Sequence, residues 1–107
     1  MTAYILFQRD ATNNQQALDR YSERADSTFA GHDVQVLVDY GTHEVLEGPP
    51  IEGVVVLRFP DASAAKDWYL SEQYQEAVQD RFQGATYRAV LVDGADAGVR
   101  TAWSTLH

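Results

Sequence analysis

A nearly continuous apolar run from Gly53 to Phe59 does most to restrict the fold of this chain. A strand with one solvent-exposed face alternates polar and apolar residues, whereas an unbroken short apolar run is typical of a strand that is buried on both faces. Pro60 ends the run, because proline has no amide hydrogen to give to a sheet ladder. The pattern predicts a central strand.

The remaining chain predicts three more strands and two helices. Apolar residues at helical spacing mark the helices, and alternating or aromatic runs mark the strands. Gly31 is the expected stop of the first helix, Asp61 the expected cap of the second, and Ser71 the cap of its continuation after a kink. In that continuation the expected buried face carries Tyr74, Ala77, Val78 and Phe82. The predicted strands are 3–8, 34–40, 53–59 and 87–92, and the helices are 14–30 and 62–82.

The element order is strand, helix, strand, strand, helix, strand. Two βαβ halves of about 45 residues fit the ferredoxin-like arrangement. We therefore predict an α+β fold, βαββαβ, with a four-stranded antiparallel sheet and both helices on one face. Residues 1–94 form this domain, and residues 95–107 are a C-terminal extension with Trp103 as its expected anchor.

The sheet is predicted to be apolar on both faces. In the central strand, for example, Val54 and Val56 point opposite to Val55 and Leu57. Helices cover only one face, and several hundred square ångströms of apolar surface on the other are too much to leave in water. A second copy would bury ~800 Å² per partner. We predict a homodimer closed sheet against sheet.

Charge and composition exclude several partners. Sixteen acidic residues against eight basic ones give a formal charge of -8, which repels nucleic acid and anionic lipid. No apolar stretch approaches the ~18 residues of a membrane span, and the first residues lack the pattern of a secretion signal. The chain contains no cysteine, which fits a reducing compartment. We expect a cytoplasmic protein that binds neither nucleic acid nor membrane.

Short segments spread over residues 1–94 carry a family resemblance: Glu44–Gly48, Val55–Pro60, Ala64-Ala65, Trp68-Tyr69, Tyr74-Gln75, Arg81 and Val92–Gly94. They resemble the DUF1330 family, within the dimeric α/β-barrel superfamily. The resemblance implies a ferredoxin-like protomer paired into a barrel, with a cleft between sheet and helices. It implies no single reaction, because similar branches include cofactor-free oxygenases, isomerases, cyclases, haem-dependent enzymes and ligand-sensing domains. Where members show an arginine followed by two glycines, this chain has Asp39-Tyr40-Gly41. A contact between that arginine and an anionic substrate is therefore in doubt for this chain.

Glu47 and His43 are the candidate catalytic residues. A carboxylate beside a glycine turn and an apolar strand is a candidate acid or base; the alternative is an ion pair with Arg58 or Arg88. His43 is near Glu47 in sequence, but only a folded loop would bring the two together. His32 and His107 complete no metal-ligand spacing. We predict no metal, no haem and no other cofactor.

Ligand-binding candidates are aromatic or basic residues on the predicted helices and strands. Aromatic side chains near one another on the second helix suggest a wall for a flat ligand, with core packing as the alternative. Arg81 is a candidate for a ligand carboxylate or a structural charge, and Asp39 is a candidate partner for Arg58. The full set is Tyr4, Tyr40, Arg58, Trp68, Tyr69, Tyr74 and Arg81.

Two function classes follow. One is a cofactor-independent enzyme of isomerase, cyclase, lyase or oxygenase type that acts on a small apolar or aromatic metabolite. The other is a non-catalytic dimer that binds a ligand or serves a structural role. No nucleophile elbow, phosphate-binding loop or dinucleotide fingerprint is present in the sequence.

Overall fold

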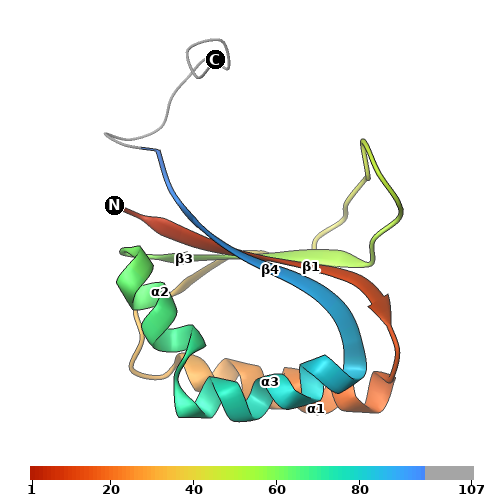
Figure 1. Cartoon of the computed structure of the whole chain (residues 1–107), viewed down its shortest axis with the longest axis horizontal. Helices are drawn as coiled ribbons and strands as arrows, with labels where there is room; N and C mark the ends of the chain where they lie inside the picture. Colours follow the sequence, from red (N-terminus) through yellow and green to blue (C-terminus); the bar gives the residue numbers. More distant parts are fainter. Residues whose placement is uncertain (96–107) are drawn as a thin grey trace.

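A four-stranded sheet arches over a layer of helices in the computed structural model, which describes residues 1–95 (Figure 1). The predicted α+β, ferredoxin-like architecture is confirmed. The second predicted helix is divided in two, and the first strand extends four residues beyond Gln8. In chain order the elements are β1 Ala3–Thr12, α1 Gln15–Ala25, the 3-10 helix η1 Asp26–Phe29, β2 Gln35–Asp39, β3 Gly53–Phe59, α2 Ala62–Tyr69, α3 Glu72–Gly84 and β4 Ala85–Asp93.

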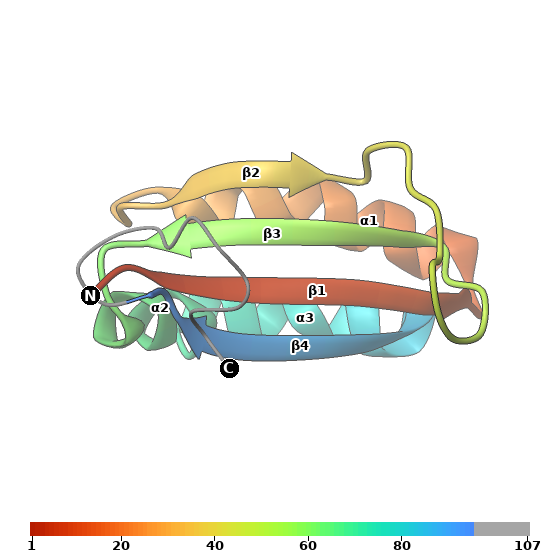
Figure 2. The same ribbon diagram turned by 90° about the horizontal axis from the view of Figure 1, so that it is seen from above.

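The strand order is β2-β3-β1-β4, and every neighbouring pair is antiparallel. Figure 2 shows the four strands side by side with the helices on one face. The predicted central strand, β3, lies between β2 and β1, as its unbroken apolar run requires. Leu6 of β1 lies opposite Val56 of β3 and Val90 of β4, so these three side chains share the face without helices.

Capping residues set the helix starts. Asp61 accepts from the Ala64 amide at 2.8 Å and Ser71 accepts from the Tyr74 amide at 3.3 Å, as the sequence predicted. Gly31, with φ of 82°, follows the end of η1. The predicted helix 14–30 is therefore an α-helix completed by a 3-10 turn.

The predicted buried face of the second helix was wrong at Phe82. Phe82 is 56% exposed, whereas Arg81 is 3% exposed. At ~100° per residue, Arg81 lies about 20° from Tyr74 around the helix, and Phe82 lies about 80° away. In β2, Val36 lies opposite Leu57 and Val38 opposite Val56, so the intervening residue forms a bulge that reverses the alternation.

The core lies between the sheet and the helices, and Trp68 is at its centre. Its ring centroid lies 4.1 Å from that of Tyr74 and 5.8 Å from that of Phe59. Its indole Nε1 donates to the Thr28 hydroxyl at 3.0 Å, so the polar atom of this buried side chain is satisfied. The cluster consists of Ile5, Phe7, Leu57, Phe59, Ala65, Trp68, Tyr74 and Val78.

The face of the sheet without helices is apolar, as predicted. Leu6 and Val38 are each 39% exposed, Val90 is 52% exposed and Val92 is 46% exposed. The polar side chains of Gln8, Arg58 and Arg88 share this face, according to the strand register. No element within residues 1–95 covers this apolar centre. None of the helices in the same part of the chain has the length and apolar content of a membrane span.

Candidate functional site

A cavity of about 270 Å³ lies between the helical face of the sheet and the first helical segment. It is where the family resemblance placed a cleft. Side chains from every strand and from α1, η1 and α2 surround it. The lining residues are Phe7, Tyr21, Ser22, Ala25, Asp26, Phe29, Val36, Asp39, Tyr40, Val55, Leu57, Trp68 and Tyr87.

The cavity wall is largely aromatic, with a few polar tips. Phe29 packs against Trp68 with ring centroids 5.2 Å apart, and these rings form one side. The polar side chains of the lining are three tyrosines, Ser22 and the carboxylates Asp26 and Asp39. An apolar chamber with a small number of placed polar groups is the usual form of a small-molecule site.

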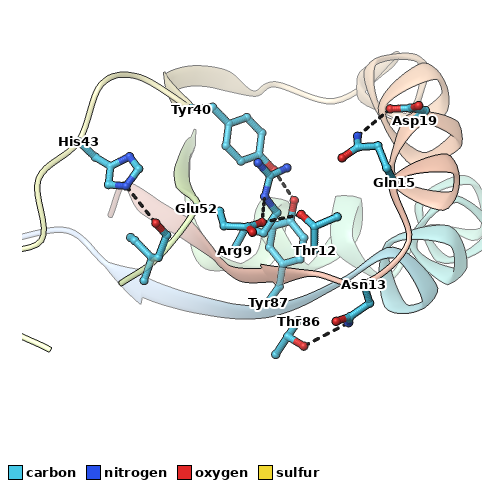
Figure 3. A network of polar contacts seen from close by, with 11 residues as sticks. Arg9, Thr12, Asn13, Gln15, Asp19, Tyr40, His43, Glu52, Thr86 and Tyr87 are labelled. Carbon is cyan, nitrogen blue, oxygen red and sulfur yellow. Dashed lines mark hydrogen bonds and ion pairs between the residues drawn. The ribbon is translucent and has the colours of Figure 1, made fainter. Parts of the chain in front are cut away.

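Tyr40 and Tyr87 meet across one end of the cavity through their hydroxyl groups (Figure 3). The Arg9 guanidinium lies over the Tyr40 ring, 4.8 Å from its centroid. Gly53 leaves room for this ring, because a Cβ at position 53 would collide with it. These contacts hold Tyr40 at φ of 54°, a backbone conformation that costs ~1–3 kcal/mol in a residue other than glycine.

Arg9 belongs to a small polar cluster behind Tyr40. Its Nε lies 3.2 Å from Glu52 Oε1, an ion pair without the alignment of a hydrogen bond. The Thr12 hydroxyl donates to Glu52 at 2.5 Å, and this bond is the main cause that lowers the pKa of the Glu52 carboxyl. The cluster ties β1 to the start of β3 at the end of the cavity.

Tyr21 provides a second polar tip, and its hydroxyl lies 2.9 Å from that of Tyr74. Burial raises the pKa of Tyr21 and of Tyr40 above the ordinary range, and each hydroxyl partner adds to the effect. Both side chains are therefore neutral at physiological pH. They suit hydrogen bonding or proton donation to a ligand oxygen, not service as tyrosinate bases.

Arg81 is buried behind three rings that line the cavity. Its guanidinium carbon lies 4.8 Å from the Tyr87 centroid, 5.3 Å from that of Phe7 and 5.9 Å from that of Tyr21. Burial raises the pKa of Tyr74, and the positive charge of Arg81 opposes that rise. Among residues 1–95, Arg81 forms no ion pair, and its Nε has no hydrogen-bond partner.

The predicted ligand-binding residues fall into three places. Tyr40 and Trp68 line the cavity, and Tyr74 lies in the core beside it with no exposed surface. Tyr69 and Arg81 line a separate groove beside β4. Tyr4 and Arg58 are opposite one another on the face of the sheet without helices.

The suggested Arg58–Asp39 pairing was wrong. Asp39 lies opposite Val55 and lines the cavity, so it is on the helical side, away from Arg58.

The two predicted catalytic residues lie on the loop between β2 and β3. Residues 40–52 rise on the side of the sheet opposite the helices (Figure 1). His43 Nε2 lies 3.2 Å from the Ile51 carbonyl oxygen, and both His43 and Glu47 are exposed. Neither lines the cavity, and Glu47 forms no ion pair among residues 1–95. Their catalytic role stays a prediction.

Several residues in and around the cavity carry no sequence signal of a site. Tyr21 lies within the predicted helix 14–30 and Tyr87 at the start of the predicted strand 87–92, and nothing local distinguishes them from packing residues. Asp39 enters the cavity because of the bulge in β2. Arg9, which contacts Tyr40 but is not part of the cavity lining, belongs to no sequence motif. In the described part of the chain, no three His, Asp or Glu side chains come together as a metal site.

The family model described as "Domain of unknown function (DUF1330)" matches residues 2–95. The chain belongs to the DUF1330 family. A search of curated proteins finds no match. Among solved structures, this DUF1330 chain is similar to a protein of unknown function from Rhodopseudomonas palustris, with a TM-score of 0.68, 20% identity, and coverage of 89% of this chain and 83% of that one.

Two further structures share the fold at lower identity. One is described as a dimeric protein of unknown function with a ferredoxin-like fold, from Bacteroides fragilis; its TM-score is 0.60, with 8% identity over 87% of this chain and 96% of that one. The other is SnoaB from Streptomyces nogalater, described as a cofactor-independent oxygenase; its TM-score is 0.55, with 10% identity over 90% of this chain and 94% of that one. At such identities the likeness concerns the fold alone.

Proposed function

We propose that this DUF1330 protein is a homodimer that binds a small aromatic or apolar metabolite in the cavity between sheet and helices. The observation that carries the proposal is the cavity itself, an aromatic-walled space of about 270 Å³ with tyrosine hydroxyls at its margins. An apolar cavity of ~150 Å³ already holds benzene, and ordinary ligand sites measure ~300–1,000 Å³. The ligand that fits is a compound of one or two rings.

The polar side chains of the cavity determine which ring compounds can bind there. Tyr21 and Tyr40 remain protonated, so each offers a hydroxyl hydrogen to a carbonyl or hydroxyl oxygen of the ligand. Asp26 and Asp39 accept hydrogen bonds from ligand hydroxyls. A ring compound with oxygen substituents therefore matches the cavity better than a plain hydrocarbon does.

The dimer is proposed from the uncovered face of the sheet. An apolar patch with a polar rim is the anatomy of an interface, and the Bacteroides fragilis protein of similar fold is described as dimeric. The loop 40–52 projects on this same side, so a second copy would lie beside the segment that carries His43 and Glu47. Zero cysteines in the chain fit the cytoplasm as the proposed compartment.

The ligand proposal is tested by a fragment screen followed by calorimetry. We expect hydroxylated one- and two-ring aromatics to raise the melting temperature, because a ligand that binds only the native state stabilises it. Ser22 is exposed but lines the cavity, so Ser22→Phe should fill space and weaken binding about tenfold or more. Glu23→Phe, at the next exposed position of α1, is the matched control. Binding that is equal in the two variants would contradict the proposal.

A catalytic form of this function is the second candidate. SnoaB shows that a protein of this fold can be a cofactor-independent oxygenase, and neutral tyrosine hydroxyls can stabilise an oxygen anion that develops on a ligand. In this version Glu47 or His43 moves the proton. Because neither residue lines the cavity, this requires the loop that carries them to reach the ligand from outside the lining. Once turnover is found, Glu47→Gln should lower kcat by about a hundredfold or more if Glu47 is the acid or base. A variant with unchanged kcat would leave Glu47 with a structural role.

A further inference from the structure

A second hollow lies outside the cavity, along the free edge of the sheet. It is a groove of about 380 Å³ between the ends of α2 and α3 and the edge strand β4. Its lining residues are Tyr69, Arg81, Phe82, Ala85, Thr86, Tyr87 and Ala89. Tyr87 lines both spaces, so its ring is part of the wall between them.

Arg81 is the unusual member of this lining. It is 3% exposed, its Nε has no hydrogen-bond partner, and none of the carboxylates in residues 1–95 lies within ion-pair distance. The preceding residue, Asp80, is instead paired with two arginines of α1, Arg20 at 3.1 Å and Arg24 at 3.5 Å. A buried guanidinium normally has an anionic partner, because its desolvation is costly.

Aromatic rings compensate for part of that cost. The guanidinium carbon lies 4.8 Å from the Tyr87 centroid and 5.3 Å from that of Phe82, both in the groove. Ring faces attract a cation, but they leave the planar fork of N–H donors without the bidentate acceptor for which it is shaped. A planar anion with two oxygens would supply that acceptor.

We propose that the groove is a second binding site, which takes the carboxylate of an aromatic acid. Arg81 receives the carboxylate, and the ring of the ligand packs against Tyr69 and Phe82. Phe82 is 56% exposed, and an aromatic acid would cover it. The Thr86 side chain adds a hydroxyl to the lining.

Electrostatics make the site selective. The chain has a formal charge of -8, so most of its surface repels anions. The positive charge of Arg81, which has no ion-pair partner among residues 1–95, opposes this repulsion at the groove. A neutral amide of the same shape keeps the ring contacts but loses one acceptor oxygen and the attraction between opposite charges.

The test compares 2-naphthoate with 2-naphthamide by titration calorimetry on the full-length protein. We expect the acid to bind the wild type about tenfold or more tightly than the amide, the factor that follows from one charge-assisted hydrogen bond. Arg81→Met should abolish that preference, and Arg81→Lys should retain part of it. Equal affinity of the wild type for acid and amide would overturn the proposal.

Two variants at exposed positions show where the acid binds. They keep the proposal testable even if the Arg81 variants fail to fold. Ala89 is exposed and lines the groove, so Ala89→Trp should block the acid while leaving the cavity open. Ser22→Phe, in the cavity, should leave the acid preference unchanged. Naphthoate binding that survives Ala89→Trp but is lost in Ser22→Phe would place the acid in the cavity and overturn the groove site, without contradicting the proposed function.

Discussion

Leu6→Asp is expected to convert the proposed dimer into monomers. Leu6 lies on a central strand, on the face without helices, between Val56 and Val90 of the neighbouring strands. In a two-fold interface the substitution occurs twice, and each unpaired buried charge costs ~3–5 kcal/mol. The dissociation constant should therefore rise about a thousandfold or more.

Sedimentation velocity at micromolar concentration is the measurement. Leu70→Asp is the matched control, since Leu70 is 67% exposed at the end of α2, on the helical side of the sheet. The control should remain dimeric. A monomeric wild type, or a Leu6→Asp protein that is still a dimer, would remove the proposed interface and require another explanation for the apolar face.

Trp68→Ala should cost ~3–5 kcal/mol of the free energy of unfolding. The side chain is 1% exposed, packs against Phe7, Phe59 and Tyr74, and donates to Thr28. Its removal leaves a cavity that the surrounding rings cannot fill without leaving their rotamers. Because small domains have ~5–15 kcal/mol in total, this single change should remove a large part of the stability.

Urea denaturation followed by far-UV circular dichroism measures the loss. All proteins should be compared at one concentration, because a dimer's stability depends on it. Leu70→Ala, an exposed position on the same helical segment, should change stability by no more than about 0.5 kcal/mol. A loss below 1 kcal/mol in Trp68→Ala would show that the neighbouring side chains rearrange to fill the space. Trp68 would then be part of an adaptable cavity wall and not the centre of the core.

Local patterns predicted much of the fold because their physical causes are local. The run in β3 indicated a central strand, and the side chains of Asp61 and Ser71 cap helices that begin one residue later. The cavity was harder to predict. The sequence predicts Tyr40 and Trp68 as ligand-binding residues. Tyr21 and Tyr87 look like ordinary packing residues until the sheet and α1 bring them together.

The sequence alone determined the order of the elements, the family, and the apolar character of both sheet faces. Each of these can be recognised in short stretches of consecutive residues. Only the tertiary structure decided that the bulge in β2 turns Asp39 into the cavity and that α3 buries Arg81 while it exposes Phe82. It also placed Glu47 outside the cavity lining. The reason is that a side chain's direction depends on backbone register and on packing between distant segments, and neither is specified by residue type at a single position.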